Sequence, residues 1–559
     1  MPGRRTGSTA PTRRSSTRTS SRSSRSPSVS SALAPLGVRV FRLLWIAGLV
    51  SNIGSWMQTV GAQWLLVEHG SPASVVALVQ TAAAAPVLLL ALPAGVLGEF
   101  FNRRTLLIVV QAAQFVIVLG LAWLTWAGAT TPAVLLALTF LLGACSAVQL
   151  PAYQAVVPEV VPAPMIADAA VLSSVGVNVA RAIGPALAGL VVAQLGVTAV
   201  FVANALSFLV FLVALVAWRG YTPKHGRPER FLDATRAGLR YVRNAGAIRG
   251  LYLRLALFLL PANGLWALLP VLASAELHLN AGGYGLLLAA LGVGSVAGAF
   301  LLPPLRARFS TGVIVAASSG VFGLCTLALA LLGTLWLVLL VLVVAGFAWI
   351  GVIATINGTV QSFLPVWVRT RGLSIYQLVL FGSTAIGAAA TGALAGWAGV
   401  VPVLVGCGVL LVVLGVVGAL RPAVDTRGKG RAIVPMPLTD LPMVQGEESP
   451  DDAADPPVLV LIRYAVPPER RADFETRMRF VGRSRRRTGA RDWRLYTDRE
   501  DPAVLVEAFQ VGSWSEHLSQ HDERMTEYDR QLLEEARALA DGEPEVEHLL
   551  EAETTRRRG

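Results

Sequence analysis

Long apolar blocks alternate with short polar connections over most of the 559 residues. A helix that spans a bilayer needs about 20 mainly apolar residues, because the hydrocarbon core is about 30 Å thick and each helical residue rises about 1.5 Å. A longer polar loop separates the blocks into two groups of six. The pattern therefore predicts twelve membrane helices, at 40–66, 75–98, 105–127, 133–157, 166–194, 196–218, 250–273, 284–304, 311–333, 335–360, 373–397 and 400–420.

Polar segments flank and divide this apolar region. The first of them is rich in Ser, Thr and Arg and has no apolar run, so it cannot bury a core and is expected to be disordered. It also lacks the apolar stretch of a signal peptide. The predicted organisation is a basic tail, a six-helix half, a central loop, a second six-helix half, a linker and a soluble domain, at 1–37, 38–218, 219–249, 250–420, 421–457 and 458–552.

Beyond the linker the apolar pattern becomes that of a soluble α+β domain. Strands are predicted at 458–464, 492–497, 504–511 and 546–550, and helices at 468–487 and 513–541. The order βαββαβ is typical of a ferredoxin-like fold. The predicted fold class is thus an all-α membrane protein of twelve helices with a small α+β domain.

Lys and Arg occur on one side of the predicted membrane only. The odd-numbered connections contain neither residue, whereas nine arginines lie within the first 42 residues. By the positive-inside rule this places both termini in the cytoplasm of a multi-pass protein of the plasma (inner) membrane. The net charge of +12 then reflects topology and contact with lipid headgroups rather than nucleic acid. The even-numbered loops carry Arg103, Arg104, the run 219–249, Arg306, Arg308, Arg369 and Arg371.

Composition excludes several other classes. Only 15% of residues are charged, against roughly 25% in soluble proteins. Cys145, Cys325 and Cys407 are scattered singly, which predicts neither disulfides nor a metal centre. No Gly-x-x-x-x-Gly-Lys-Ser/Thr loop is present, which argues against ATP-driven pumping. No cofactor is expected.

The two halves repeat weakly in one register. Gln154-x-x-x-Pro158 recurs as Gln361-x-x-x-Pro365, and an Ala-Leu-Ala-Gly sequence that ends at Gly189 recurs 207 residues later. Duplicated halves with a substrate site between them are the architecture of alternating-access carriers.

Two motifs resemble those of the major facilitator superfamily. The loop sequence with Gly95, Glu99, Arg103 and Arg104 resembles its cytoplasmic signature, although Phe100 and Asn102 depart from it. The resemblance implies a conformational latch, and the alternative is that the arginines serve topology alone. The predicted fifth helix contains Gly184, Pro185 and Gly189, which look like the antiporter motif of this helix.

Together with the first-helix sequence at 51–58, these motifs are similar to transmembrane secretion effectors related to enterobactin exporters. The resemblance implies export of a small organic molecule, such as a siderophore, drug or secondary metabolite, with possible coupling to protons.

The soluble domain resembles the antibiotic-biosynthesis-monooxygenase group of dimeric α/β barrels. The resemblance implies pairing of two copies, and Trp493, His517 and His521 are conceivable participants in catalysis. The two histidines have i,i+4 spacing, which also suits a metal, but no third ligand is identifiable. We expect solvated histidines and an association or regulatory module, not an enzyme.

Arg181 is the strongest candidate for substrate binding. It lies about fifteen residues into its helix, and charges at this depth are costly. Its counterpart in the repeat is Ala388, so the scaffold does not require an arginine there; a structural arginine is the alternative.

No carboxylate occurs at mid-membrane, and Glu68 and Asp168 are marginal candidates for proton carriers. Further candidates for the site are Asn52, Trp56, Gln58, Asn178, Asn263 and Asn357, with Trp266 and Trp349 as possible stacking partners.

Two other functions remain open on the sequence alone. The protein could be a membrane sensor or scaffold that signals through its soluble domain, or a bifunctional membrane enzyme. An uptake carrier would have almost the same sequence pattern as an exporter.

Overall fold

The computed structural model describes residues 33–100, 102–218, 231–421, 433–434 and 457–550. Within this part, twelve helices are long and apolar enough to cross a membrane. The twelve predicted membrane helices are confirmed. They are α2 (Arg39–Glu68), α3 (Ala73–Phe100), α4 (Arg103–Trp126), α5 (Pro132–Val160), α6 (Ile166–Leu195), α7 (Val197–Ala217), α9 (Gly246–Val271), α10 (Ala281–Arg308), α11 (Thr311–Leu331), α12 (Leu335–Phe363), α13 (Val366–Ala398) and α14 (Val400–Leu420).

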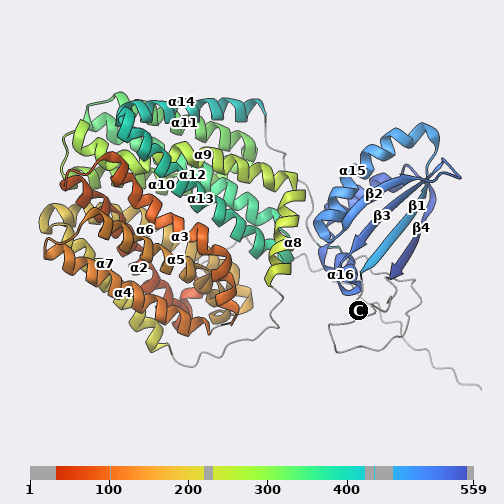
Figure 1. Cartoon of the computed structure of the whole chain (residues 1–559), viewed down its shortest axis with the longest axis horizontal. Helices are drawn as coiled ribbons and strands as arrows, with labels where there is room; N and C mark the ends of the chain where they lie inside the picture. The colour runs from red at the N-terminus through yellow and green to blue at the C-terminus, as the bar shows by residue number, and fades with distance from the viewer. Residues whose placement is uncertain (1–32, 101, 219–230, 422–432, 435–456, 551–559) are drawn as a thin grey trace, which may run out of the picture.

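The helices form two halves that repeat the same order. In Figure 1 the first half, α2 to α7, lies below the second half, α9 to α14. Gly246, Ala281 and Thr311 begin α9, α10 and α11, and they follow the first residues of α2, α3 and α4 by 207 or 208 residues. The weak repeat in the sequence therefore corresponds to equivalent helices.

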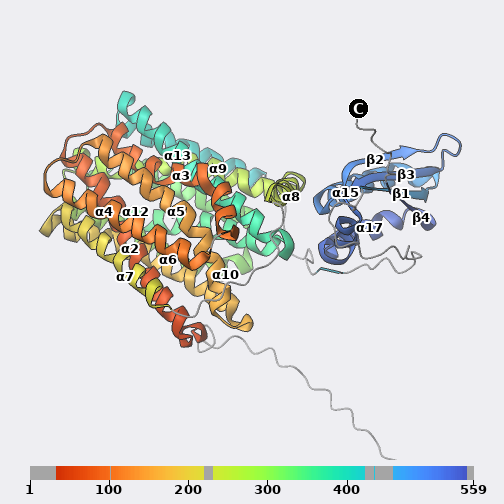
Figure 2. The ribbon, with the colours of Figure 1, turned by 60° about the horizontal axis from the view of Figure 1, so that its bottom comes forward.

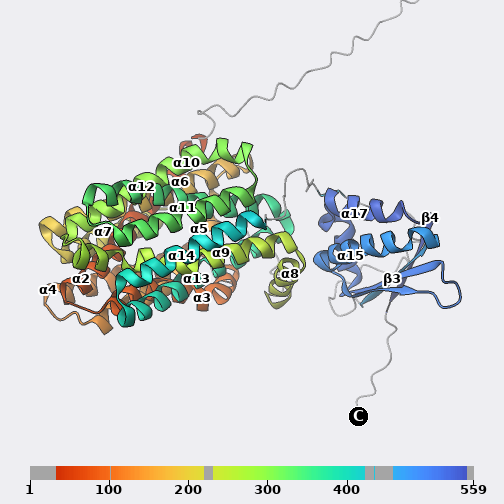
Figure 3. The same cartoon turned by 90° about the horizontal axis from the view of Figure 1, so that it is seen from above.

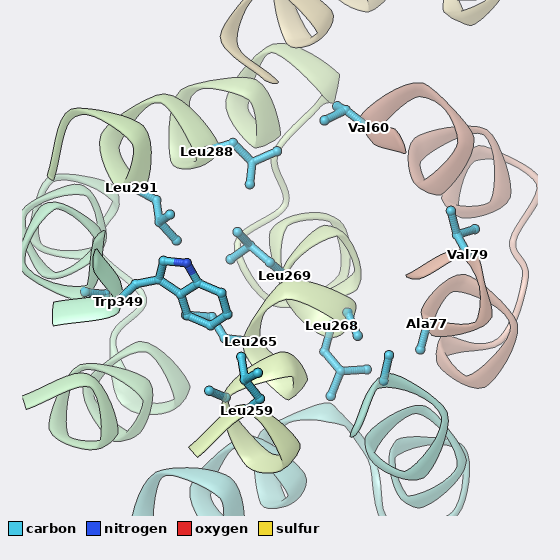
Figure 4. Packing of buried hydrophobic residues seen from close by; sticks show 14 of the residues in the cluster. Val60, Ala77, Val79, Leu259, Leu265, Leu268, Leu269, Leu288, Leu291 and Trp349 are labelled. Carbon is cyan, nitrogen blue, oxygen red and sulfur yellow. The ribbon is translucent and has the colours of Figure 1, made fainter. Parts of the chain in front are cut away.

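Helix α9 occupies the most buried position in the bundle. Inside the protein, 72% of its apolar window is buried, the largest share among the twelve helices. Figure 4 shows its leucines, including Leu265 and Leu268, between the helices that carry Val60 and Val79 and those that carry Leu291 and Trp349. A helix with apolar residues on all sides suits such a central position.

Two segments near the bundle differ from the prediction. The predicted central loop contains a helix, α8 (Phe231–Asn244), and the predicted disordered tail ends in a 3₁₀ turn, η1 (Ala34–Gly37). α8 is amphipathic and polar overall, so a search for long apolar blocks misses it. Its buried Tyr241 packs edge-on against Trp367 of α13, at 5.8 Å between ring centroids. Residues 1–32 lie outside the described part of the chain.

The soluble domain has the predicted βαββαβ order. Its antiparallel sheet has the strand order β2-β3-β1-β4. Phe474, Met478 and Leu533 from the covering helices pack on one face of the sheet, and Figure 3 shows α15 and α17 on that side. The elements are β1 (Val458–Ala465), α15 (Arg471–Thr488), β2 (Arg491–Thr497), β3 (Val504–Val511), α16 (Trp514–Ser519), α17 (Glu527–Arg537) and β4 (Asp541–Leu550).

The long helix predicted at 513–541 is wrong. The chain forms the short α16, a π-helical turn η5 (Gln520–Arg524) and then α17. Thr526 interrupts the helix because its hydroxyl and Asp529 form a capping box that starts α17 anew. The final strand is also longer than predicted.

The soluble domain lies against one end of the bundle, where α8 is placed between the two (Figures 1 and 2). We call this the domain end, and the opposite end the far end. Of the predicted linker, the described Ile433 forms a β-bridge with Thr526, while most of the linker lies outside the described residues.

Candidate functional site

Arg181 lies midway along α6 and connects side chains from both halves of the bundle. Its guanidinium carbon is 5.4 Å from the ring centroid of Trp56 on α2, a cation–π geometry. It also lies near the hydroxyl of Tyr376 on α13, which is beside the side chain of Asn357 on α12 and has no hydrogen-bond partner among the described residues. Arg181 is half-buried, and its Nε atom has no hydrogen-bond partner in the described part of the chain.

The α6 backbone places Trp56 against this arginine. Gly184 follows Arg181 by three residues and so lies on the same face of the helix. A Cβ at Gly184 would be 2.6 Å from the Cβ of Trp56, so only glycine permits this approach of α2 to α6. Gly184 and the buried Pro185 therefore have a packing role beside the site.

Aromatic rings continue from Trp56 into the second half. The ring of Trp266 lies 6.2 Å from that of Trp56 and 5.5 Å from that of Trp349. Phe258 and Phe322 extend the series on the other side of Trp349, at 5.7 Å each. The structure therefore places a cationic group at one end of a series of packed aromatic rings that runs into the core of the second half.

The halves contact each other closely toward the far end. The side chain of Gln63 on α2 accepts a hydrogen bond from Tyr284 of α10 at 3.0 Å and donates one to the carbonyl of Trp266 at 3.4 Å. The α6–α10 crossing depends on glycine, because a Cβ at Gly189 would lie 2.3 Å from the Cα of Gly285. These contacts close the far end, and Arg181 lies on their domain side.

Three predicted site residues lie elsewhere, in contacts that stabilise helix packing. Asn52 donates to the carbonyl of Gly48 one turn earlier. Gln58 accepts from Asn204 of α7 within the first half. Asn263 donates to its own helix and, at 3.4 Å, to Thr384 of α13. The side chain of Asn178 lies outside the described residues.

The arginines of the predicted latch bind within the first half. Arg103 forms an ion pair with Glu159 at the end of α5. Arg104 donates hydrogen bonds of 3.0 Å to two carbonyls at the end of α7. The side chains at Gly95 and Glu99 lie outside the described residues, so a latch between the halves stays a prediction.

Sequence reasoning missed Tyr376 as a member of the site. The helix predicted at 373–397 placed Tyr376 near its end, whereas α13 begins at Val366 and brings this residue ten positions into the helix. The expectation of solvated histidines in the soluble domain is wrong for His517, which is completely buried. Among the described residues, no group of three or more His, Cys, Asp or Glu side chains is arranged to hold a metal ion.

Comparison with known proteins adds a family and its relatives. The family model described as transmembrane secretion effector matches residues 30–556. The Staphyloferrin A transporter of Staphylococcus aureus is 22% identical over 276 residues, which cover 49% of this chain and 70% of that protein. The multidrug efflux pump Tap of Mycobacterium tuberculosis is 24% identical over 401 residues, which cover 68% of this chain and 93% of the pump.

Solved structures agree on the fold of the bundle. A bacterial homologue of the human lysosomal transporter Spinster, in an inward-facing and unoccupied conformation, matches with a TM-score of 0.54 at 15% identity, over 70% of this chain and 97% of that one. The nucleoside transporter NupG, solved as a point mutant, matches with a TM-score of 0.58 at 12% identity, over 68% of this chain and 99% of that one.

Proposed function

The chain belongs to the transmembrane secretion effector family of the major facilitator superfamily, and from this premise we propose that it exports a small organic anion by alternating access. It is a multi-pass membrane transporter with a small-molecule substrate. The observation that carries the finer proposal is the half-buried guanidinium of Arg181, which lies against Trp56 of the first half and near Tyr376 of the second and whose Nε has no partner among the described residues.

The chemistry of the site favours a substrate with an acidic group and an apolar or aromatic body. A charge at mid-membrane is retained only where it has a partner or a function. Trp56 and Tyr376 give Arg181 partial compensation, and neither supplies a counter-charge. A carboxylate on the substrate would supply it, while the rings of Trp56 and Trp266 would stack on the body.

Export as the direction is supported by the relatives. One is named a multidrug efflux pump and another a transporter of staphyloferrin A. We propose that this chain likewise moves small molecules outward, with the domain end in the cytoplasm. The arginine-rich loops at that end support the orientation. Protease digestion of the soluble domain in right-side-out vesicles would refute this orientation.

Alternating access follows from where the halves touch. In the far-end-closed arrangement, Arg181 would be reached from the domain end. Release would require separation of the Gln63–Tyr284 contact and of the α6–α10 crossing. Glu68, which accepts a hydrogen bond of 2.8 Å from Trp64 beside Tyr284, is our candidate for coupling this opening to protons.

We propose that the soluble domain is an association or regulatory module rather than an enzyme. The sheet face opposite α15 and α17 exposes Leu459, Tyr496 and Leu549. A second copy could cover this apolar face, and size-exclusion chromatography with light scattering of the full chain tests such dimerisation.

Substitution of Arg181 tests the proposed transport. We expect Arg181→Ala to lower efflux of anionic compounds by roughly tenfold or more, since a hydrogen bond to a charged group contributes about 1.5–3 kcal/mol. Arg181→Lys should retain part of the flux. The measurement is efflux of a panel of fluorescent organic anions and cations from cells, with and without a proton uncoupler.

The matched control is Arg254→Gln. Arg254 is also in a membrane helix, but it binds the carbonyl of Arg421 at the domain end. Equal flux through Arg181→Ala and the parent protein, at equal membrane levels, would remove Arg181 from the substrate site.

A further inference from the structure

A cluster of three histidines lies inside the soluble domain, away from the membrane site. The ring centroid of His517 on α16 is 4.9 Å from that of His521 and 5.0 Å from that of His548 on β4. Trp514 borders the cluster, at 5.6 Å from His517. His517 is completely buried, although the sequence places it on a polar helix.

The hydrogen bonds around His517 leave one of its ring nitrogens unused. Its Nδ1 lies 3.3 Å from Oε1 of Gln520, and the amide of Gln520 donates to Thr488 at 2.8 Å, which fixes the amide orientation. Nδ1 therefore carries the proton, and Nε2 is left as a buried acceptor without a partner among the described residues. Nδ1 of His548 is likewise buried and unpartnered there. Each such group costs about 1–3 kcal/mol in an empty domain.

A cavity of about 140 Å³ opens beside the cluster. His521, His548, Arg485 and Arg537 line its polar side, and apolar residues such as Phe509 line the remainder. Arg485 is compensated by an ion pair of 3.2 Å with the buried Glu507. The Nε of Arg537 has no hydrogen-bond partner in the described part of the chain. The polar side of the cavity therefore contains two nitrogens without a partner among the described residues, Nε of Arg537 and Nδ1 of His548.

We propose that this cavity binds a small carboxylate with an apolar body, and that its occupancy is relayed to the membrane bundle through α16 and η5. A carboxylate would accept hydrogen bonds from Arg537 and from a histidine N–H, and the apolar wall would bury the body. Burial and the neighbouring His548 lower the pKa of His517 to about 4, so the ring is neutral when the cavity is empty.

The same short segment makes one of the contacts with the bundle; another runs from α15, where the guanidinium of Arg487 lies 5.9 Å from the ring centroid of Tyr241 on α8. Glu516, next to His517, accepts hydrogen bonds from Arg240 of α8 at 3.0 Å and from Arg524 at 3.1 Å. The guanidinium of Arg524 lies 5.0 Å from the ring centroid of Trp367, in the first turn of α13. The segment therefore joins the two regions: His521 of η5 lines the cavity, while Arg524 of η5 and Glu516 of α16 make the docking contact.

Helix α13 continues from this contact to the substrate site. Tyr376, which interacts with Arg181, follows Trp367 by nine residues, or about 14 Å along the helix axis. A ligand that shifts η5 moves Arg524, which lies over the ring of Trp367. Loss of this contact would change the position of α13. This relay rests on the proposed transport function, whereas binding in the cavity does not.

Benzoate binding to the full-length chain in nanodiscs tests the site. Isothermal titration calorimetry should detect binding of benzoate and much weaker binding of benzyl alcohol, which lacks the charge. Arg537→Gln and His548→Asn should each weaken benzoate binding roughly tenfold, while the exposed Arg479→Gln on α15 should leave it unchanged. Absence of benzoate binding, or equal affinity in Arg537→Gln, would overturn the proposal.

Hydrogen–deuterium exchange tests the relay on the same samples. Benzoate should change exchange at 238–244 and 366–372 in the parent protein and leave Arg537→Gln unaffected. Binding without such a change overturns the relay. Because benzoate also has the acidic group and aromatic body proposed for the transport substrate, both measurements are repeated in an Arg181→Ala chain. Benzoate binding that persists there and is weakened by Arg537→Gln reports the cavity alone, so a failure of the transport site is distinguishable from a failure of the cavity.

Discussion

Arg181 and Glu507 are both charged groups held away from bulk water, and their surroundings differ in a decisive way. Glu507 accepts hydrogen bonds from Arg485, Tyr464 and Trp493 at 3.2, 3.1 and 2.8 Å. Arg181 has a ring face and a tyrosine, but its Nε is unpartnered among the described residues. A satisfied buried charge is structural, whereas an incompletely satisfied one is available to a ligand.

Neutralising Glu507 should destabilise the soluble domain. Glu507→Gln leaves Arg485 buried without its counter-charge, and breaking such a pair costs about 3–5 kcal/mol. The measurement is hydrogen exchange of β1 in the full-length chain. Glu534→Gln, which breaks the exposed pair with Arg530, is the control and should change stability by less than about 1 kcal/mol. Equal effects of both substitutions would contradict this interpretation.

His517 should make the soluble domain sensitive to acid. Its pKa is about 4 in the folded chain against 6.5 for a free histidine, so the unfolded chain binds a proton first as the pH falls. The contribution of the neutral His517 to the free energy of unfolding is complete above pH 6.5. It is lost as the pH falls from 6.5 to 4, and the total loss is roughly 3 kcal/mol. Exchange protection of β1 across this pH range measures the effect, and His517→Gln should reduce the slope. A slope unchanged by the substitution would exclude His517 as its origin.

At the scale of elements, the two halves meet mainly at helix crossings where the two backbones come very close together. The α6–α10 crossing brings Gly189 against Gly285, and α3 meets α13 where Ala77 lies against Gly392. Small residues permit such crossings in a membrane, where no hydrophobic effect drives helices together. The same contacts must separate when the far end opens.

Gly189→Ala should shift the carrier away from the far-end-closed state. A Cβ 2.3 Å from the Cα of Gly285 cannot be accommodated, and overpacking of this kind costs about 1–3 kcal/mol. Labelling of Gln63→Cys by an impermeant maleimide, in a chain without its native cysteines, should become faster. Gly120→Ala on α4 is the control, since a Cβ there meets nothing within 4 Å. Equal labelling rates in the two variants would refute the role of this crossing.

At the scale of the whole molecule, the transport machinery and the soluble domain are separate parts that meet at the domain end. Arg181, the aromatic series and the contacts that close the far end all lie within the twelve helices. The domain contacts α8 and α13 through Glu516 and Arg524, and α8 also through Arg487 of α15. This arrangement suits a carrier with an attached regulator.

Deletion of residues 457–559 should leave measurable flux, because every proposed substrate contact remains. Export assays of the truncated chain at matched membrane levels provide the measurement. Complete loss of export from a correctly inserted truncated chain would instead support a sensor or enzyme that acts through the domain.

The sequence by itself determined the number, order and repeat of the membrane helices. These follow from local composition, since a span must be apolar over about 20 residues whatever its neighbours are. The same logic predicted the βαββαβ order and singled out Arg181, because a charge deep in an apolar block is visible without any structure. The approximate positions of the helices were likewise predicted, with ends that differ by up to seven residues, the largest difference being at the start of α13.

Only the tertiary structure decided which of the polar candidates meet. Asn52, Gln58, Asn263 and Asn357 have the same sequence signal, and all four bond within or between packed helices, but Asn357 also lies beside Tyr376 near Arg181. Likewise, His517 on a polar helix becomes buried, and polar α8 becomes a docking element. Contacts between segments hundreds of residues apart depend on how helices pack, and no local pattern records them.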